Sequence, residues 1–250
     1  MSEQTCIKKG NALRFFAQLF SVALVTGMCG SAAAGTVTPP EGCEAFLTVQ
    51  STSCEVEHYW QCDSDPDGVK WRYVLGQDGP TYVSQVDDEY RWLFSENLIN
   101  GRQEFMGKRE KDRQSMGDLL TSGVDSYDFV QLLSYPGRGV IEQHITGFDR
   151  LNGDNIVVDG QALLGSDYEL REVSGEDAFE MRGQEYVLEE FNLFLGGIGE
   201  FRNNDGIWES YNQSPITFAR PGGAGFLTDT PLFGCGEILS ALDAPVTPAG

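Results

Sequence analysis

Apolar and polar residues alternate along much of the chain with a period of two, which is typical of half-buried β-strands. Between Cys54 and Cys62 the even positions are mostly apolar and the odd positions are mostly polar. Upstream, four residues share one face of a second strand: Cys43, Ala45, Leu47 and Val49. A turn centred on residues 52 and 53 would place Cys43 opposite Cys62 and Leu47 opposite His58. The two strands are therefore predicted to pair as a hairpin with coinciding apolar faces.

Similar alternation recurs between dipeptides such as Asp78-Gly79 and Asn152-Gly153, which tolerate positive φ and mark hairpin turns. Further strands are predicted at residues 69–75, 90–94, 129–133, 140–148, 155–158, 168–173, 178–181, 186–195 and 216–219. One short helix is predicted over residues 108–121, since Met116 and Leu119 share a face and Gly123 follows. About ten strands with one helix predict a mainly β fold, either a single antiparallel β-barrel or a curved sheet or sandwich.

The first 34 residues have the features of an export signal. Lys8, Lys9 and Arg14 precede an apolar stretch over residues 15–28, and three alanines end at Ala34. The apolar stretch is shorter than the roughly 20 residues that a membrane span requires, although an uncleaved anchor is the alternative. We expect cleavage after Ala34 and export to the periplasm or the extracellular space.

The remaining chain is predicted to form one β-rich globular domain, residues 35–243, and a flexible tail, residues 244–250. The domain has no second long apolar run, so we expect no membrane span after cleavage. Its four cysteines, an even number in an exported chain, indicate two disulfides. A strand from Cys54 to Cys62 would be roughly 26 Å long, too far for a bridge. The register pairs Cys43 with Cys62, which leaves Cys54 for Cys235.

Charge and composition exclude several classes of protein. The chain has 17 Lys and Arg against 38 Asp and Glu, a net charge of −21. Without the first 34 residues, which hold three basic and one acidic residue, the charge is −23. An unaided nucleic-acid binder or a binder of anionic membranes needs the opposite sign. The 11% of aromatic residues exclude a disordered acidic tail.

The segment 63–68 is the sharpest local motif. Asp63, Asp65 and Asp67 alternate before Gly68, as in loops that wrap oxygen ligands around calcium. Position twelve of such a loop is Val74, where an EF-hand requires a bidentate glutamate. The motif is therefore either an ordinary acidic turn or a weak Ca²⁺ site, and no other cofactor is expected.

Candidates for catalysis are few. The chain has two histidines and no G-x-S-x-G segment that would position a nucleophilic serine. His58 lies on the apolar face of its strand, where a hydrogen-bonded core histidine is the ordinary outcome. His144 shares a strand face with Glu142, so these two residues form the one weak candidate for a base and its orienting carboxylate. No catalytic residue is otherwise assigned.

Large aromatic residues could line a ligand cavity or fill the core: Tyr59, Tyr82, Trp92, Phe191, Phe201 and Trp208. The sequence does not identify a ligand. We favour an exported, soluble, non-enzymatic binding or envelope-associated protein that takes a small apolar ligand or a protein partner. The alternatives are a secreted hydrolase that uses acidic residues, and a structural module stabilised by calcium.

Overall fold

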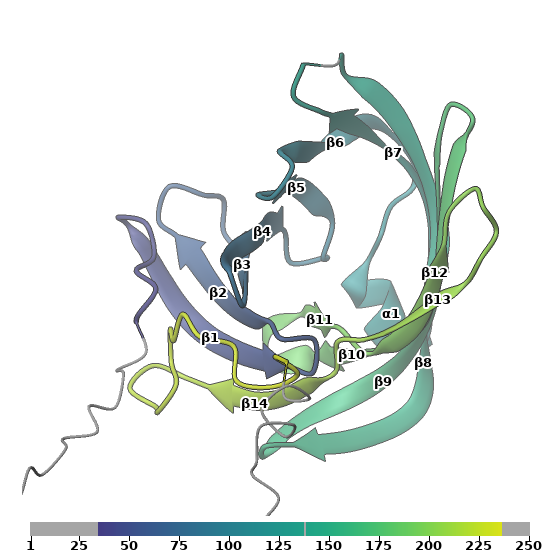
Figure 1. Ribbon diagram of the computed structural model, residues 1–250. Coiled ribbons are helices and arrows are strands. Elements are labelled where there is room, and N and C mark those ends of the chain that lie inside the picture. The colour runs from purple at the N-terminus through teal and green to yellow at the C-terminus, as the bar shows by residue number, and fades with distance from the viewer. Residues whose placement is uncertain (1–34, 138, 237–250) are drawn as a thin grey trace, which may run out of the picture. The chain divides into compact units, whose positions relative to one another are not determined.

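A computed structural model describes residues 35–137 and 139–236, in which the chain forms one large antiparallel sheet (Figure 1). The strands before the helix are β1 (Cys43–Ser51), β2 (Val56–Cys62), β3 (Lys70–Gly76), β4 (Gly79–Val86), β5 (Trp92–Asn97) and β6 (Arg102–Asp112). The helix is α1 (Met116–Ser122). After it come β7 (Val124–Ser134), β8 (Ile141–Val158), β9 (Gln161–Ser174), β10 (Asp177–Leu188), the 3₁₀ turn η1 (Glu189–Phe191), β11 (Leu193–Leu195), β12 (Ile198–Arg202), β13 (Glu209–Asn212) and β14 (Pro215–Ala219).

The sheet is a long meander that curls back toward its first strand (Figure 1). Consecutive strands pair from β1 to β10, β12 and β13 continue this order, and β14 returns to pair with β1. The two edge strands, β13 and β14, are not hydrogen-bonded to each other. Among the predicted alternatives, the fold is therefore a curved open sheet. Thr52 binds to the segment that connects β13 to β14. Its amide donates to the Ser214 carbonyl oxygen at 3.0 Å, and its hydroxyl donates to the Asn212 carbonyl oxygen at 2.9 Å.

The predicted hairpin between β1 and β2 has the expected register only in its first part. Cys43 lies opposite Cys62, but a bulge shifts the pairing so that Leu47 faces Tyr59 and His58 faces Thr48. A bulge of one residue moves later side chains without removing the alternation, so the period alone does not reveal it. Disulfides join Cys43 to Cys62 and Cys54 to Cys235, as the register argument predicted.

The prediction of one short helix is confirmed for residues 116–121, but its first part, residues 108–115, was wrong. Residues 108–112 belong to β6, whose outer half is exposed on both faces and therefore shows no period of two. The helix begins after Ser115, whose hydroxyl accepts a hydrogen bond from the Asp118 amide at 3.1 Å, and ends at Gly123 with φ of 83°. Four strands, β4, β6, β12 and β13, had not been predicted.

The predicted strand at residues 186–195 is also interrupted. It breaks at η1, where Asn192 has φ of 48°, and continues as the short β11. This break turns β11 back to pair with β10. The end of β10 and β11 thus form a short antiparallel hairpin.

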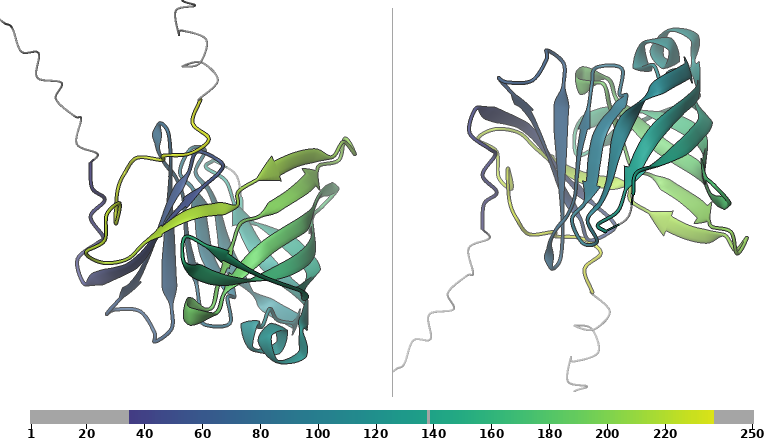
Figure 2. Two further views of the ribbon diagram at one scale, coloured as in Figure 1. Left: turned by 90° about the horizontal axis from the view of Figure 1, so that it is seen from below. Right: turned by 90° about the horizontal axis from the view of Figure 1, so that it is seen from above.

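Apolar side chains fill part of the space inside the curve. One cluster joins Leu47 and Tyr59 of the first hairpin to Leu193 of β11. A second cluster packs Leu119 of α1 against Val187 of β10. The helix therefore covers one end of the curved sheet (Figure 2).

The predicted signal at residues 1–34 and the predicted tail at residues 244–250 lie outside the described residues. Within residues 35–137 and 139–236, no helix has the length and apolar character needed to cross a bilayer.

Candidate functional site

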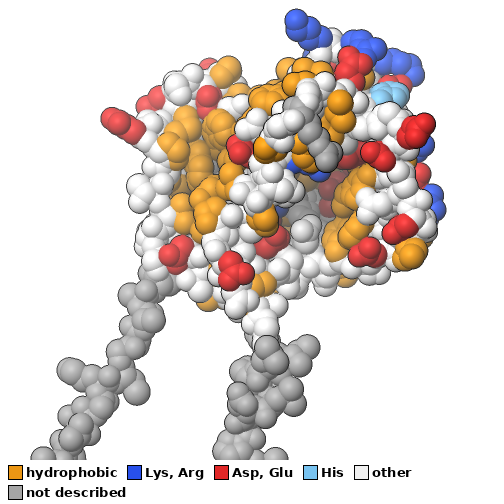
Figure 3. Space-filling view, turned by 45° about the horizontal axis from the view of Figure 1, so that its top comes forward, with side chains coloured by type: hydrophobic (Ala, Val, Ile, Leu, Met, Phe, Trp, Pro, Cys, Tyr) orange, Lys and Arg blue, Asp and Glu red, His pale blue; other side chains and the backbone are white. Residues whose placement is uncertain are grey.

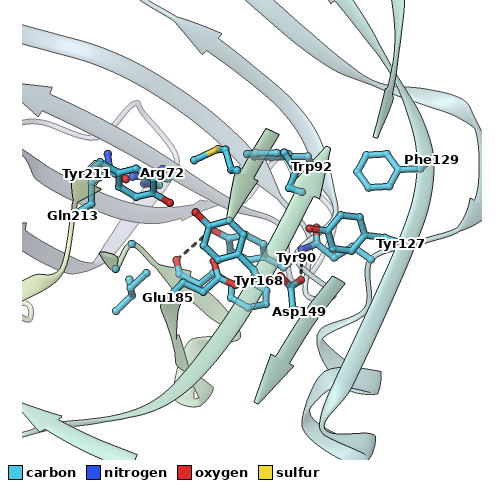
Figure 4. Close-up of a pocket in the computed structure, with 17 residues that line it drawn as sticks. Arg72, Tyr90, Trp92, Tyr127, Phe129, Asp149, Tyr168, Glu185, Tyr211 and Gln213 are labelled. Carbon is cyan, nitrogen blue, oxygen red and sulfur yellow. Dashed lines mark hydrogen bonds between the residues drawn. The ribbon is translucent and has the colours of Figure 1, made fainter. Parts of the chain in front are cut away.

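A cavity of about 190 Å³ lies against the inner face of the curved sheet, near α1 (Figure 4). Aromatic and aliphatic side chains from several strands supply most of its wall: Tyr90, Trp92, Tyr127, Phe129, Tyr168, Leu170, Met181, Phe194, Leu195 and Tyr211. Five side chains with charged or amide groups complete it: Arg72, Gln114, Asp149, Glu185 and Gln213. A hollow flanked by hydrophobic side chains is visible on the surface (Figure 3).

Three of the wall tyrosines lie directly opposite a glycine on the neighbouring strand. The pairs are Tyr127 with Gly147, Tyr168 with Gly183, and Tyr211 with Gly199. A Cβ atom at residue 147 would lie 2.6 Å from the Tyr127 hydroxyl, and one at residue 199 would lie 2.5 Å from the Tyr211 hydroxyl. At these two pairs the glycine thus leaves room for the ring to lie across its neighbour.

Two carboxyl groups meet in this cavity. Asp149 of β8 is 3% exposed and shares a hydrogen bond with Glu185 of β10. Burial raises the pKa of both groups, and the nearness of Asp149 raises that of Glu185 further. Like charges at hydrogen-bond distance cannot both ionise easily, so the pair holds a proton between its two carboxyls.

Gln114 and Ser115, which precede α1, bind the carboxyls of Asp149 and the neighbouring Asp125. Gln114 donates from Nε2 to Asp149 Oδ2 at 3.2 Å. The Ser115 amide donates to Asp125 Oδ2 at 2.9 Å, and Asp125 lies directly opposite Asp149 in the β7–β8 pairing. Burial raises the pKa of Asp125 to about 6. A third carboxyl therefore adds to the negative potential at the pair.

Arg72, the one basic residue among the described residues that line the cavity, is already neutralised. Its Nε and Nη2 atoms donate to Glu57 at 2.8 and 2.7 Å. Tyr59 also donates to Glu57, which is 4% exposed. Burial alone would raise the pKa of Glu57, but the charge and hydrogen bonds of Arg72, together with the hydrogen bond from Tyr59, outweigh burial and lower this pKa. Glu57 is therefore ionised and balances the charge of Arg72.

A larger hollow of about 780 Å³ lies farther along the inner face and shares Trp92 with the first cavity. Glu172 of β9 lines it and accepts from Gln143 Nε2 at 2.6 Å. Burial, together with the like charge of Glu104, raises the pKa of Glu172 to about 7. Arg102 lies 3.8 Å from Glu172 but is paired more closely with Glu104.

Glu172 is expected to make stability fall as pH rises. Because its pKa is raised in the fold, its contribution is full below about pH 4.5 and is lost as the pH rises through about 7. Replacing Glu172 by Gln should remove roughly 3 kcal/mol of this pH dependence, so the variant should be the more stable protein at pH 8 and similar at pH 4. Urea unfolding across this range measures the difference.

Glu169→Gln, an exposed site on the same strand, is the control and should leave the pH profile unchanged. A Glu172→Gln profile that follows the wild type at every pH would contradict the pKa assigned to this carboxyl.

The residues predicted for catalysis lie elsewhere. His144 is exposed, and its Nε2 lies 2.7 Å from Asp128 Oδ1, while Glu142 is paired with Arg109. Glu142 and His144 lie on β8 with Asp149, but on the opposite face of that strand, because their positions differ from 149 by an odd number. Basic side chains and a histidine accordingly gather at one corner of the outer surface (Figure 3).

The predicted calcium turn follows β2. Trp71 donates its indole N–H to Asp65 at 2.7 Å, which holds the turn against β3. Within the described part of the chain, no group of three or more His, Cys, Asp or Glu side chains is arranged to hold a metal ion. Calcium binding by Asp63, Asp65 and Asp67 stays a prediction.

Of the six aromatic candidates, Trp92 lines the cavity that contains the carboxyl pair, and Tyr82 lines the larger hollow. Tyr59 and Phe191 pack in the apolar core. Trp208 packs against Arg182, whose Cζ atom lies 4.3 Å from the centre of the ring. The residues that sequence reasoning missed are the wall tyrosines and the carboxyl pair.

A signal for the missed residues is present on β7. Asp125, Tyr127, Phe129 and Gln131 occupy alternate positions, so polar groups stand on the face that also carries the rings. An acidic residue on the apolar face of a strand indicates either a buried charge that destabilises the core or a functional site.

Comparisons of the chain with protein-family models, with curated proteins and with solved structures found no match. Any inference about function therefore rests on the chemistry of the cavity itself.

Proposed function

We propose that this is an exported protein that binds a small, largely aromatic or apolar molecule on the inner face of its curved sheet. The observation that carries the proposal is the cavity of about 190 Å³ with aromatic walls and one group of convergent polar side chains. This combination is typical of small-molecule sites. The size is adequate, because an apolar cavity of about 150 Å³ can hold benzene.

Export is supported by the two disulfides, which persist in oxidising compartments. The periplasm and the extracellular space are both consistent with this pattern. The strong negative charge favours solubility and opposes attachment to anionic membranes.

Native mass spectrometry of protein purified from its own source, followed by a thermal-shift screen of single-ring molecules, tests the proposal. A ligand at 100 times its Kd should stabilise the fold by about 2.7 kcal/mol. Met181→Trp should reduce this effect, because Met181 lines the cavity and a larger ring would occupy it.

Val157→Trp is the control, because Val157 is 72% exposed and is not among the residues that line the cavity. This variant should respond to ligands as the wild type does. If no molecule copurifies and none in the screen binds, or if Met181→Trp binds as well as the wild type, the cavity is not the binding site.

Acid–base hydrolysis at the same carboxyl pair is the second candidate function. Two carboxyls that share a proton can activate a water molecule, as in aspartic proteases. Asp149 and Glu185 interact directly through a shared hydrogen bond, as in a carboxyl pair that shares a proton, whereas the two carboxyls of a glycosidase act from opposite sides of the scissile bond. Turnover that disappears in Asp149→Asn while binding is retained would favour this candidate over simple binding.

A further inference from the structure

We propose that the cavity selects a small organic ammonium ion, which it binds against Asp149 and Glu185. This inference rests on the proposed binding function and names the chemical class of its ligand. A primary ammonium carries a positive charge and three hydrogen-bond donors, and the carboxyl pair offers acceptors for them.

The charges of the cavity wall favour a cation. Arg72 is balanced by Glu57 through two hydrogen bonds, so it leaves no positive charge to neutralise a further carboxylate. Asp149, Glu185 and the adjacent Asp125 then have no cationic partner among the described residues that line or adjoin the pair. A ligand with a positive charge would supply the missing partner, whereas an anionic ligand would meet repulsion.

Tyr127 adds a further polar group to the cavity wall that contains the carboxyl pair. Tyr127 is 5% exposed and lines the cavity, and its ring packs against that of Phe129. The ring projects from β7 toward the neighbourhood of Asp149 (Figure 4). A phenol hydroxyl can accept a hydrogen bond as well as donate one, so Tyr127 suits a ligand that carries hydrogen-bond donors.

The aromatic walls suit the same ligand. Tyr90, Trp92 and Tyr168 line the cavity together with the carboxyl pair. The faces of such rings attract organic cations, more strongly when water is excluded. A single-ring or short-chain ammonium fits the volume of about 190 Å³.

Binding of a cation is expected to release a proton. Several polar and titratable groups surround the carboxyl pair. Strands β7 and β9 contribute Asp125, Tyr127 and Tyr168, and the segments before β5 and α1 contribute Tyr90 and Gln114. Strand β3 contributes Arg72, which is paired with Glu57 of β2. The tyrosines Tyr90 and Tyr127 stay neutral, because burial raises the pKa of each. The proton shared by Asp149 and Glu185 is therefore the one that an incoming ammonium displaces.

Three probes of the same shape test the inference: benzylamine, benzyl alcohol and benzoate. At pH 7, isothermal titration should show benzylamine binding at least about tenfold more tightly than benzyl alcohol, with benzoate weakest. Titration in two buffers of different ionisation enthalpy should show proton release with benzylamine and none with benzyl alcohol.

Asp149→Asn and Glu185→Gln should each bring the ratio of benzylamine to benzyl alcohol affinity close to one and abolish proton release. Both substitutions remove a buried acid, so the fold is expected to persist, and circular dichroism checks this. The matched control, Glu169→Gln, removes an exposed charge from β9 and should behave as the wild type.

Equal affinity for benzylamine and benzyl alcohol would overturn the ammonium inference and leave the proposed binding function intact. A preference for benzylamine that survives both substitutions would also overturn it, because the charge would then come from elsewhere. Binding of none of the three probes rejects the inference as well, and the copurification and screen above then decide the binding function separately.

Discussion

Removal of the disulfide between Cys54 and Cys235 is expected to destabilise the fold by about 5 kcal/mol, more than any other change considered for this chain. The two cysteines are 181 residues apart, so their bridge restricts nearly the whole described chain in the unfolded state. The Cys43–Cys62 bridge spans only 19 residues, and the same loop-entropy relation gives about 3 kcal/mol for it.

Double Cys→Ala variants of each pair, unfolded in guanidinium, measure the two losses. Each variant keeps the other disulfide, so the two are matched controls for one another. A larger loss from the 43–62 pair would show that local strain or residual structure, and not loop length, determines the contribution of these bridges.

Glu57→Gln is the second substitution with a large expected effect, a loss of about 3 kcal/mol in the free energy of unfolding. It removes one partner of a buried ion pair and leaves Arg72 with a charge that is only partly accessible to solvent, since its side chain is 27% exposed. The Tyr59 hydroxyl also loses its ionised acceptor. Denaturant unfolding at pH 7 measures the loss.

Glu142→Gln is the control, because it removes a carboxylate from an ion pair with Arg109 that is exposed on both sides. Such pairs contribute about 0–1 kcal/mol. Equal losses in the two variants would mean that burial of Glu57 does not strengthen its pairing with Arg72.

The sequence allowed the first hairpin and both disulfides to be predicted because β1 and β2 each have one buried face. Alternation along these strands specifies which residues point inward, and Cys43 and Cys62 then fall opposite each other. The bulge after Ala45 could not be predicted, because an extra residue leaves the pattern on each side intact. At β6 the outer half is solvated on both faces, so the charges of Lys108 and Lys111 resembled the start of a helix.

The candidate site was harder to predict because it depends on how the sheet curves. Asp149 and Glu185 lie on β8 and β10, with a full strand between them, and in the sequence each is one acidic residue among 38. Their contact requires the registers of both pairings and the curvature of the sheet. His144, a more conspicuous residue in the sequence, is on the opposite face of β8.

The pairing of β14 with β1 has a consequence for the order of folding. Along the meander, strands that pair are close in sequence, so each contact closes a short loop at little entropic cost. The pairing of Thr48 with Ala219 instead closes a loop of most of the chain. We therefore expect the first and last strands of the chain, β1 and β14, to pair last. The Cys54–Cys235 bridge then links the segments that follow these two strands covalently, so that β1 and β14 do not separate during local opening.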